Sequence, residues 1–347
     1  MKASMKMALA ATGVAAGVVA RRMYWQSRER ELKGEVVLIT GGSRGLGLAL
    51  ARQFAHEGCR LAICARDREE LERARAGLAG DGAEVIAISC DVKKRSEVQQ
   101  LVQEVTAHFG RIDILITNAG TIQVGPVQSV EVEDFEDAMD VMFWGTVYPT
   151  LALLPAMMER NRGHLVHITS IGGKVSVPHL LPYTSAKYAA TGFSEGLRTE
   201  LVRTGVMVTT IAPGLMRTGS YNAALFKGDQ EAEAAWFSLG ASMPGLSMDA
   251  DRAARQILTA VKRGDSEKVL TAPASVLARL YGMAPSLIGT AIGLAGTLLL
   301  PTAETPAPAA QKHSRMGRSL TNLQTPKMKA ALFLGRMAAR RFNQKLA

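Results

Sequence analysis

Hydrophobic and polar residues follow two alternating periods along most of this chain. From about residue 35 to residue 273, short runs rich in Val, Ile and Leu are followed by longer stretches with apolar residues three or four positions apart. Runs of the first kind predict strands, and stretches of the second kind predict helices. We expect strands at residues 35–40, 60–65, 84–89, 112–117, 164–170, 206–211 and 268–271, and helices at 46–57, 68–78, 96–109, 132–160, 183–204 and 248–263.

The order of these elements predicts the fold class. Strands that alternate with helices build a parallel sheet, and continuous apolar strands are expected where helices cover both faces. We therefore predict an α/β fold, a doubly wound parallel sheet of about seven strands with helices on both faces. It occupies residues 33–275, with apolar and basic extensions before it (1–32) and after it (276–347).

Each extension contains an apolar stretch without charges. Residues 7–20 cover roughly 21 Å as a helix, less than the ~30 Å of a hydrocarbon core, so they predict a marginal anchor, an interfacial helix or a signal-like segment. Residues 280–300 reach roughly 31 Å as one apolar helix, which Pro285 begins or kinks. Within it, Gly289 and Gly293 have a spacing that lets helices approach closely in lipid.

The net charge of +10 comes from the two extensions. Residues 1–34 carry a net +5 and residues 276–347 a net +9, which leaves −4 for residues 35–275. Basic charge beside apolar segments favours an anionic membrane surface over nucleic acid as a partner. The alternative is that the extensions form a lid or an oligomer contact.

A glycine-rich turn joins the first predicted strand to the first predicted helix. It contains Gly41, Gly45 and Gly47, which allow a tight turn and a close approach of the backbone to a ligand. Amides at the start of a helix bind pyrophosphate, so this unit predicts a dinucleotide site. Taken alone, the same glycines also suit a tight turn without a ligand.

The spacing of these glycines resembles that of the short-chain dehydrogenase/reductase family. Further motifs of the family follow in order: Asp91-Val92, Asn118-Ala119-Gly120, Ser170, Tyr183 with Lys187, and the segment from Pro213 to Thr218. The resemblance covers residues 33–275 and implies a Rossmann-like fold and a nicotinamide-dependent oxidoreductase. It implies cofactor contacts at Gly41, Ser43, Arg44, Gly45, Leu46, Gly47, Arg66, Asp91, Val92, Asn118, Ala119, Gly120, Tyr183, Lys187, Pro213, Gly214, Met216 and Thr218.

The end of the second predicted strand favours NADP(H) over NAD(H). A carboxylate there would bind a ribose 2′-hydroxyl and repel a 2′-phosphate. The chain has Arg66 at this point, and Arg44 in the glycine turn is a second cation. Guanidinium groups suit a phosphate because they form charge-assisted hydrogen bonds with it. Asp67 is the counter-argument, but it lies one residue further on, where it caps the next helix.

The residues at positions 170, 183 and 187 suit proton transfer on a hydroxyl. Interconversion of a ketone and a secondary alcohol moves one hydride and one proton, and a tyrosine with a pKa of about 10 needs a nearby cation to act at neutral pH. Tyr183 and Lys187 are four residues apart on one helix face. We predict Tyr183 as the general acid/base, Lys187 as the group that lowers its pKa and, by the resemblance, binds the nicotinamide ribose, and Ser170 as the group that holds the substrate oxygen.

One position departs from the family pattern. The family has an asparagine three residues before the glycine of the long helix after the fourth strand, where it helps hold a water in a proton relay. This chain has Met142 there, before Gly145, and a thioether is at best a weak acceptor. The substitution keeps open a non-catalytic alternative, a nucleotide-binding adaptor at a membrane.

The segments that shape the substrate pocket in the family are apolar here. They contain Val175, Val177, Pro178, Leu180 and Leu181, and then Leu215, Met216, Tyr221, Leu225 and Phe226. This lining favours an apolar, lipid-like carbonyl compound or alcohol, and His179 is a candidate for touching it. No residues have the spacing of a metal site.

The sequence therefore predicts a membrane-associated, NADP(H)-dependent oxidoreductase that interconverts a ketone and a secondary alcohol. Its catalytic domain is expected to face the cytoplasm, where soluble nicotinamide is available; a cytoplasmic protein is the alternative location. An NAD-dependent alcohol or hydroxysteroid-like dehydrogenase is the alternative enzyme. Pairing of long helices, common in the family, favours a homo-oligomer, and no nucleic-acid partner is expected.

Overall fold

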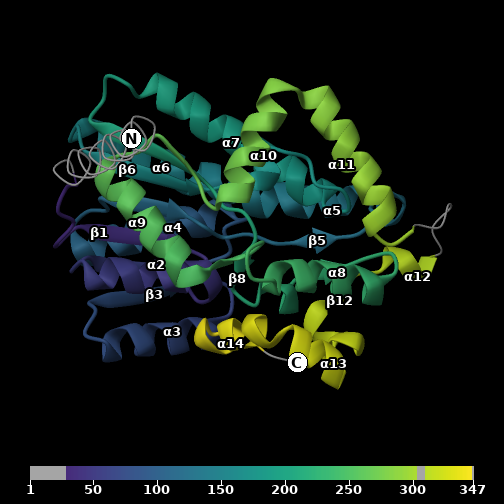
Figure 1. Ribbon diagram of the computed structural model, residues 1–347. Coiled ribbons are helices and arrows are strands. Elements are labelled where there is room, and N and C mark those ends of the chain that lie inside the picture. The colour runs from purple at the N-terminus through teal and green to yellow at the C-terminus, as the bar shows by residue number, and fades with distance from the viewer. Residues whose placement is uncertain (1–28, 303–308, 346–347) are drawn as a thin grey trace, which may run out of the picture.

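The computed structural model describes residues 29–302 and 309–345, and its centre is a parallel sheet of seven strands (Figure 1). The strands lie in the order β11-β7-β6-β4-β1-β2-β3. This order confirms the doubly wound sheet, because the chain builds outward from β1 on one side and from β4 on the other. The strands are β1 (Val36–Thr40), β2 (Arg60–Ala65), β3 (Val85–Ser89), β4 (Ile114–Thr117), β6 (Gly163–Ile168), β7 (Val206–Ala212) and β11 (Glu267–Val269).

Helices cover both faces of this sheet, as predicted. Successive strand residues point to opposite faces, so Val37 and Ile39 of β1 join one core while Val36 and Leu38 join the other. The first core is closed by α2 (Gly45–His56), α3 (Arg68–Gly80) and α9 (Ala250–Arg263). The second is closed by α4 (Arg95–Phe109), α6 (Gly145–Glu159) and α7 (Leu181–Glu200).

The long helix predicted at residues 132–160 is interrupted. It consists of α5 (Val132–Met139), a π-helical turn (Asp140–Trp144) and α6, because the Gly145 amide donates to the carbonyl oxygen of Asp140, five residues back. Taken together, these three segments (Val132–Glu159) are the one helical stretch among the described residues with the length and mean hydropathy (1.4) of a membrane span. Half of the most apolar 18-residue segment of this stretch is buried inside the fold, which is typical of a core helix.

Short strands surround the carboxyl edge of the main sheet. A pair is formed by β8 (Met216–Arg217) and β10 (Met248–Asp249), and a group of three by β5 (Gln123–Val124), β9 (Leu225–Phe226) and β12 (Arg315–Met316). The helix α8 (Gln230–Ser242) packs beside both groups. Because β12 belongs to the C-terminal extension, this extension is joined directly to the part of the fold after β7.

The apolar stretch at 280–300 is divided between two helices that form a hairpin, so a single helix over the whole stretch is wrong, whereas Pro285 does begin a helix. The helix α10 (Ala272–Met283) ends at Ala284, whose φ and ψ of −144° and 67° leave the helical region before Pro285 begins α11 (Pro285–Leu299). At 15 residues, α11 is about 22 Å long, less than the ~30 Å of a hydrocarbon core. Figure 1 shows the hairpin standing off the main sheet. Residues 7–20, the other predicted apolar segment, lie outside the described residues.

The C-terminal residues return to the glycine-rich end of the sheet. They form α12 (Ala309–Lys312), α13 (Pro326–Ala331) and α14 (Phe333–Arg341), and Figure 1 shows α14 near α3. Ala338 and Phe342 are buried in the same core as α2, α3 and α9. Ala338 and Phe342 of the extension are therefore packed into the sheet domain and do not belong to a free basic tail.

Candidate functional site

The glycine-rich turn lies between β1 and α2, at the carboxyl edge of the sheet. Gly41 and Gly45 have φ angles of 65° and 57°, where a side chain would be strained. A side chain at Gly47 would overlap the carbonyl oxygen of Gly41. From the end of β4, the side-chain amide of Asn118 donates to the carbonyl oxygens of Thr40 and Gly41, both at 3.1 Å. These contacts hold the turn in a single shape.

The start of α2 suits an anion. The amides of Leu46 and Gly47 donate to no acceptor among the described residues, whereas the Gly45 amide donates to the carbonyl oxygen of Phe342 at 2.9 Å. The first turn of α2 has no acidic residue and no side-chain cap. The start of α2 therefore keeps two free amides and no acidic side chain, which fits the pyrophosphate of a dinucleotide.

Charged residues gather where β2 ends. Arg66 is exposed and has no hydrogen bond or ion pair in the part of the chain that the structure describes. Arg44 pairs with the buried carboxylate of Glu70 at 3.0 Å. Asp67 caps α3 by accepting from the Glu70 amide (3.0 Å), which confirms the predicted cap. Its second oxygen pairs with Nζ of Lys345 at 2.5 Å.

The other predicted cofactor residues lie at the same edge of the sheet. Asp91 and Val92 follow β3, residues 118–120 follow β4, and residues 213–218 follow β7. Val92 packs against Gly145 at the start of α6, and Thr218 lies next to Gly45. The structure brings these segments together because the carboxyl ends of parallel strands meet at one edge.

Ser170, Tyr183 and Lys187 converge beside the end of β6. Gly172 lies between the two hydroxyl-bearing residues, because a Cβ there would be 3.2 Å from the Tyr183 ring and 3.4 Å from Oγ of Ser170. Lys187 is buried in α7. Its Nζ donates to the carbonyl oxygen of Ile168 (2.9 Å) and lies 5.9 Å from the centroid of the Tyr183 ring.

Met142 lies in the π-helical turn and faces the same site. Its side chain is 1% exposed and packs with Ala119, Ala186 and Tyr183 in a small apolar cluster. Its carbonyl oxygen accepts from the hydroxyl of Thr146 at 2.8 Å. The position that holds an asparagine in the family pattern is therefore an apolar contact in this chain.

Comparison with known proteins identifies the family. A family model described as short chain dehydrogenase matches residues 35–226. The chain belongs to the short-chain dehydrogenase family. It is 36% identical over 273 residues to the dehydrogenase/reductase SDR family protein 7-like of Anopheles gambiae, a match that covers 76% of this chain and 84% of that protein. The resemblance seen in the sequence is confirmed.

Solved structures agree with this assignment. A short-chain dehydrogenase/reductase of Burkholderia phymatum in complex with NAD matches with a TM-score of 0.70 and 25% identity, covering 74% of this chain and 96% of that one. An actinorhodin polyketide ketoreductase with NADPH matches with a TM-score of 0.62 and 29% identity, covering 70% and 97%. The protein is thus a Rossmann-like oxidoreductase that acts on CH–OH and C=O groups of small molecules with a nicotinamide cofactor.

Burial shifts the pKa values of Tyr183 and Lys187 in this dehydrogenase. Burial raises the pKa of Tyr183 above its usual value, and the hydroxyl of Ser170 offsets part of that rise. Burial lowers the pKa of Lys187 to about 8. The groups that act on Tyr183 are thus its apolar surroundings and Ser170, so the predicted effect of Lys187 on the Tyr183 pKa stays a prediction.

Apolar side chains gather beside Tyr183. The cluster contains Val124, Val177, Leu180, Tyr183, Tyr221, Phe226, Trp236 and Phe237, with residues of the C-terminal extension behind them. His179, before α7, has a φ of 61°, and its Nδ1 lies 2.7 Å from the buried carboxylate of Glu233. Trp236 donates to the other oxygen of Glu233 at 2.6 Å. These two contacts hold the Glu233 carboxylate at the apolar cluster and fix the position of His179, which precedes α7.

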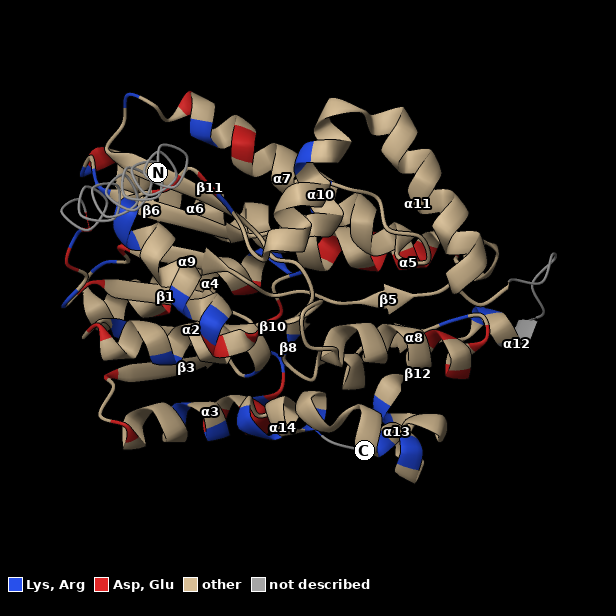
Figure 2. Cartoon of the chain, in the orientation of Figure 1, with Lys and Arg blue, Asp and Glu red and all other residues tan. Residues whose placement is uncertain are grey.

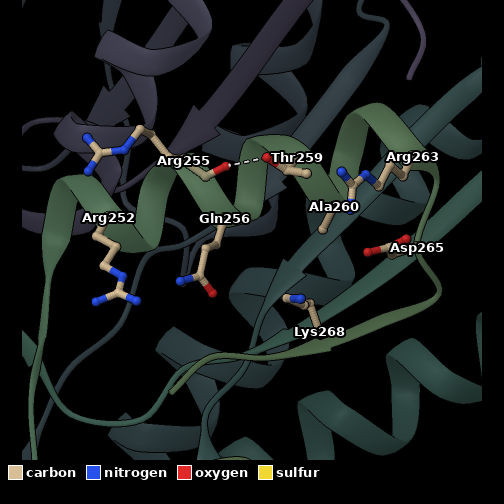
Figure 3. Close-up of a pocket in the computed structure, with 8 residues that line it drawn as sticks. All are labelled: Arg252, Arg255, Gln256, Thr259, Ala260, Arg263, Asp265 and Lys268. Atoms are coloured by element: carbon tan, nitrogen blue, oxygen red, sulfur yellow. Dashed lines mark hydrogen bonds between the residues drawn. The ribbon is translucent and has the colours of Figure 1, made fainter. Parts of the chain in front are cut away.

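A separate hollow lies on the surface along α9 and β11. It has a volume of about 470 Å³ and is open to solvent (Figure 3). Its lining residues are Arg252, Arg255, Gln256, Thr259, Ala260, Arg263, Asp265 and Lys268. None of them belongs to the glycine turn or to the group around Tyr183, so this hollow is not the dehydrogenase site.

Sequence reasoning missed the residues that the C-terminal extension adds to the site. Phe342, Asn343 and Lys345 contact the glycine turn and the start of α3. Glu70 was also missed, although its place three residues after the predicted cap Asp67 is a local signal of a helix start. The extension carried no such signal, because its partners are about 300 positions away in the sequence.

Proposed function

We propose that this dehydrogenase uses NADP(H) to interconvert a ketone and a secondary alcohol on an apolar, lipid-like substrate. The observation that carries the proposal is the convergence of Ser170, Tyr183 and Lys187 at the same edge of the sheet as the free amides of α2. The apolar cluster around Tyr183 supports the substrate class. Consumption of NADPH with a panel of medium- and long-chain ketones tests the proposal, and no consumption with any of them would count against it.

Each residue of the site has one role in this proposal. When bound, the nicotinamide supplies or accepts the hydride. In the direction of reduction, Tyr183 donates its phenol proton to the carbonyl oxygen, and Ser170 donates a hydrogen bond to the same oxygen. With a pKa of about 8, Lys187 is mostly protonated at neutral pH and stabilises the tyrosinate that remains.

The pattern of ion pairs at the end of β2 supports NADP(H). Arg66 is exposed and unpaired among the described residues, whereas Asp67 is held by Lys345. An unpaired guanidinium beside a neutralised carboxylate suits the 2′-phosphate of NADP(H). A carboxylate in place of the guanidinium would suit a ribose 2′-hydroxyl instead.

Replacement of Arg66 by Asp should reverse the cofactor preference. We expect the dissociation constant for NADPH to rise about tenfold, because the new carboxylate repels the 2′-phosphate, while NADH binds as tightly as before or more tightly. Titration of each nucleotide measures both constants. Arg95→Asp, on an exposed residue at the start of α4, makes the same change of charge on the opposite face of the sheet and should leave the preference unchanged. An unchanged ratio in Arg66→Asp would contradict the NADP(H) assignment.

We also propose that the hairpin of α10 and α11 binds a membrane. The helix α11 has no buried residue, and Leu287, Leu294 and Leu298 are 70, 62 and 84% exposed. Figure 2 shows no charged residue along α11, whereas lysines and arginines mark α12, α13 and α14. A hairpin too short to span the bilayer suits insertion of its apolar side chains into one leaflet. The catalytic domain would then stay on the cytoplasmic side.

Charges on the hairpin should release the protein from vesicles. We expect Leu294→Asp combined with Leu298→Asp to lower the fraction that sediments with phosphatidylcholine/phosphatidylserine vesicles by about tenfold or more, since aspartate is costly in an apolar layer. Val202→Asp, at a 76% exposed apolar residue after α7, is the matched control and should sediment like the original chain. An original chain that stays in the supernatant would contradict membrane binding.

The homo-oligomer also stays a prediction. Trp144, Leu151 and Met158 are spaced seven residues apart along the end of the π-helical turn and α6, and each is 39% exposed or more. An apolar stripe at this spacing suits pairing with the same helix of a second copy. Sedimentation of the detergent-solubilised chain measures the state directly.

A further inference from the structure

The last described residues of the chain lie on the cofactor turn. The Gly45 amide donates to the carbonyl oxygen of Phe342 at 2.9 Å. The side-chain amide of Asn343 donates to the carbonyl oxygens of Ser43 and Glu70, both at 2.9 Å. These contacts join the C-terminal segment to the turn after β1, where the pyrophosphate of a dinucleotide is expected, and to the first turn of α3, near the expected adenosine ribose.

This segment is anchored as part of the core. Phe342 is completely buried, and Arg52 of α2 donates to the carbonyl oxygen of Arg341 at 3.2 Å. Arg341 also pairs with Asp251 of α9, and a side chain at Gly219 would overlap Ala339 of α14. The residues from 339 to 342 are therefore packed against three separate elements. They hold Lys345, three residues further on, close to the end of β2.

The charges around the end of β2 are only partly paired among the described residues. Three carboxylates lie there, Asp67, Glu69 and Glu70, of which Glu69 is exposed and has no ion pair among the described residues. Glu70 is paired with Arg44 and Asp67 with Lys345, and the Lys345 ammonium is the first cause that holds the pKa of Asp67 below its usual value. Arg66 and Arg68 are exposed cations without a partner among the described residues, and Arg66 is the one that directly follows β2.

Without Lys345, this arrangement would change. Asp67 would lose its ion-pair partner, and Arg66 and Arg68, the residues on either side of it, would be the neighbouring cations in the sequence. A carboxylate at the end of the second strand is the feature that selects NAD(H) and repels a 2′-phosphate. The ion pair between Lys345 and Asp67 therefore bears directly on which nucleotide the site prefers.

We propose that Lys345 is a specificity-determining residue for NADP(H), which acts by neutralising Asp67 and so leaves Arg66 available to the 2′-phosphate. The inference rests on the proposed NADP(H) preference. It gives a role in cofactor choice to a residue 278 positions away from its partner, in a part of the chain that the family model does not match.

The test is nucleotide binding by the full chain at low ionic strength, followed by the fluorescence of NADPH and NADH. We expect Lys345→Met to raise the dissociation constant of NADPH about tenfold, because the Asp67 carboxylate then lies beside the 2′-phosphate without a counterion. The dissociation constant of NADH should stay within about twofold of its original value. The difference should shrink as salt is added, since both members of the pair are partly exposed. Lys329→Met removes the same charge from an exposed lysine of α13 that has no ion pair among the described residues, and it should bind both nucleotides normally.

A second variant tests the route through Asp67. Asparagine caps a helix as well as aspartate does, so Asp67→Asn keeps α3 intact while it removes the charge. We expect Asp67→Asn combined with Lys345→Met to restore NADPH binding to within about twofold of the original chain. An unchanged NADPH-to-NADH ratio in Lys345→Met, or no restoration in the double variant, would overturn the inference. An original chain that prefers NADH would instead overturn the proposed cofactor.

Discussion

Replacement of Tyr183 by Phe is expected to lower kcat about a thousandfold, since proton transfer by a positioned side chain contributes about 10²–10⁴-fold. Phenylalanine keeps the ring that packs with Met142 and Ala186 and removes only the hydroxyl. The fold and the affinity for the nucleotide should therefore be unchanged. Steady-state reduction of a ketone measures kcat, and titration with NADPH measures the affinity in the same preparation.

Two results would contradict this proton-transfer role. Turnover that survives in Tyr183→Phe would mean that another group supplies the proton. Tight binding of NADPH by the original chain without turnover on any carbonyl compound would favour the non-catalytic adaptor, and the apolar Met142 would then be its structural reason. Turnover that disappears in the variant would show that this methionine is compatible with catalysis.

A methyl group at Gly47 should abolish measurable nucleotide binding. In Gly47→Ala, the new Cβ overlaps the carbonyl oxygen of Gly41 and comes within 2.6 Å of Nδ2 of Asn118. The first overlap is with backbone, so the turn and α2 must move apart. This movement takes the amides of α2 away from the position of the pyrophosphate, and overpacking of this kind costs about 1–3 kcal/mol of stability. Nucleotide titration and thermal unfolding measure the two effects.

A second glycine provides the control. Gly77 lies in α3, on the same face of the sheet, and no atom lies within 4 Å of the position of its Cβ. Gly77→Ala should bind the nucleotide normally and raise the free energy of unfolding by about 0.5–1 kcal/mol, because alanine is the better helix former. Normal binding in Gly47→Ala would mean that the glycine turn is not the pyrophosphate site.

Much of the architecture could be predicted from the sequence because it depends on local patterns. Apolar runs such as that of β1 predicted strands, and the alternation of strands with helices predicted a doubly wound sheet, which the structure confirms. The carboxyl ends of parallel strands meet at one edge, which is why motifs as far apart as Asn118 and Gly41 lie in contact. The roles of the individual site residues stay predictions.

In the hairpin of α10 and α11, the charge-free run of the sequence led to the wrong prediction of a single helix. A run of 21 residues without charge suits one spanning helix, and composition alone could not tell this from two shorter helices. The break depends on the backbone of Ala284, which precedes a proline and leaves the helical region. The Pro285 signal was present in the sequence, but its result depended on how the two halves pack.

The sequence by itself determined the sheet, the glycine turn and the order of the family motifs, because each follows from residues close together in the chain. Only the tertiary structure decided the partner of Asp67. The sequence showed a carboxylate beside Arg66 without its counterion, which is Lys345, 278 positions away. Side-chain charges interact through space, and no periodicity or motif records a contact that forms only when α14 packs against the core and brings the end of the chain to β2.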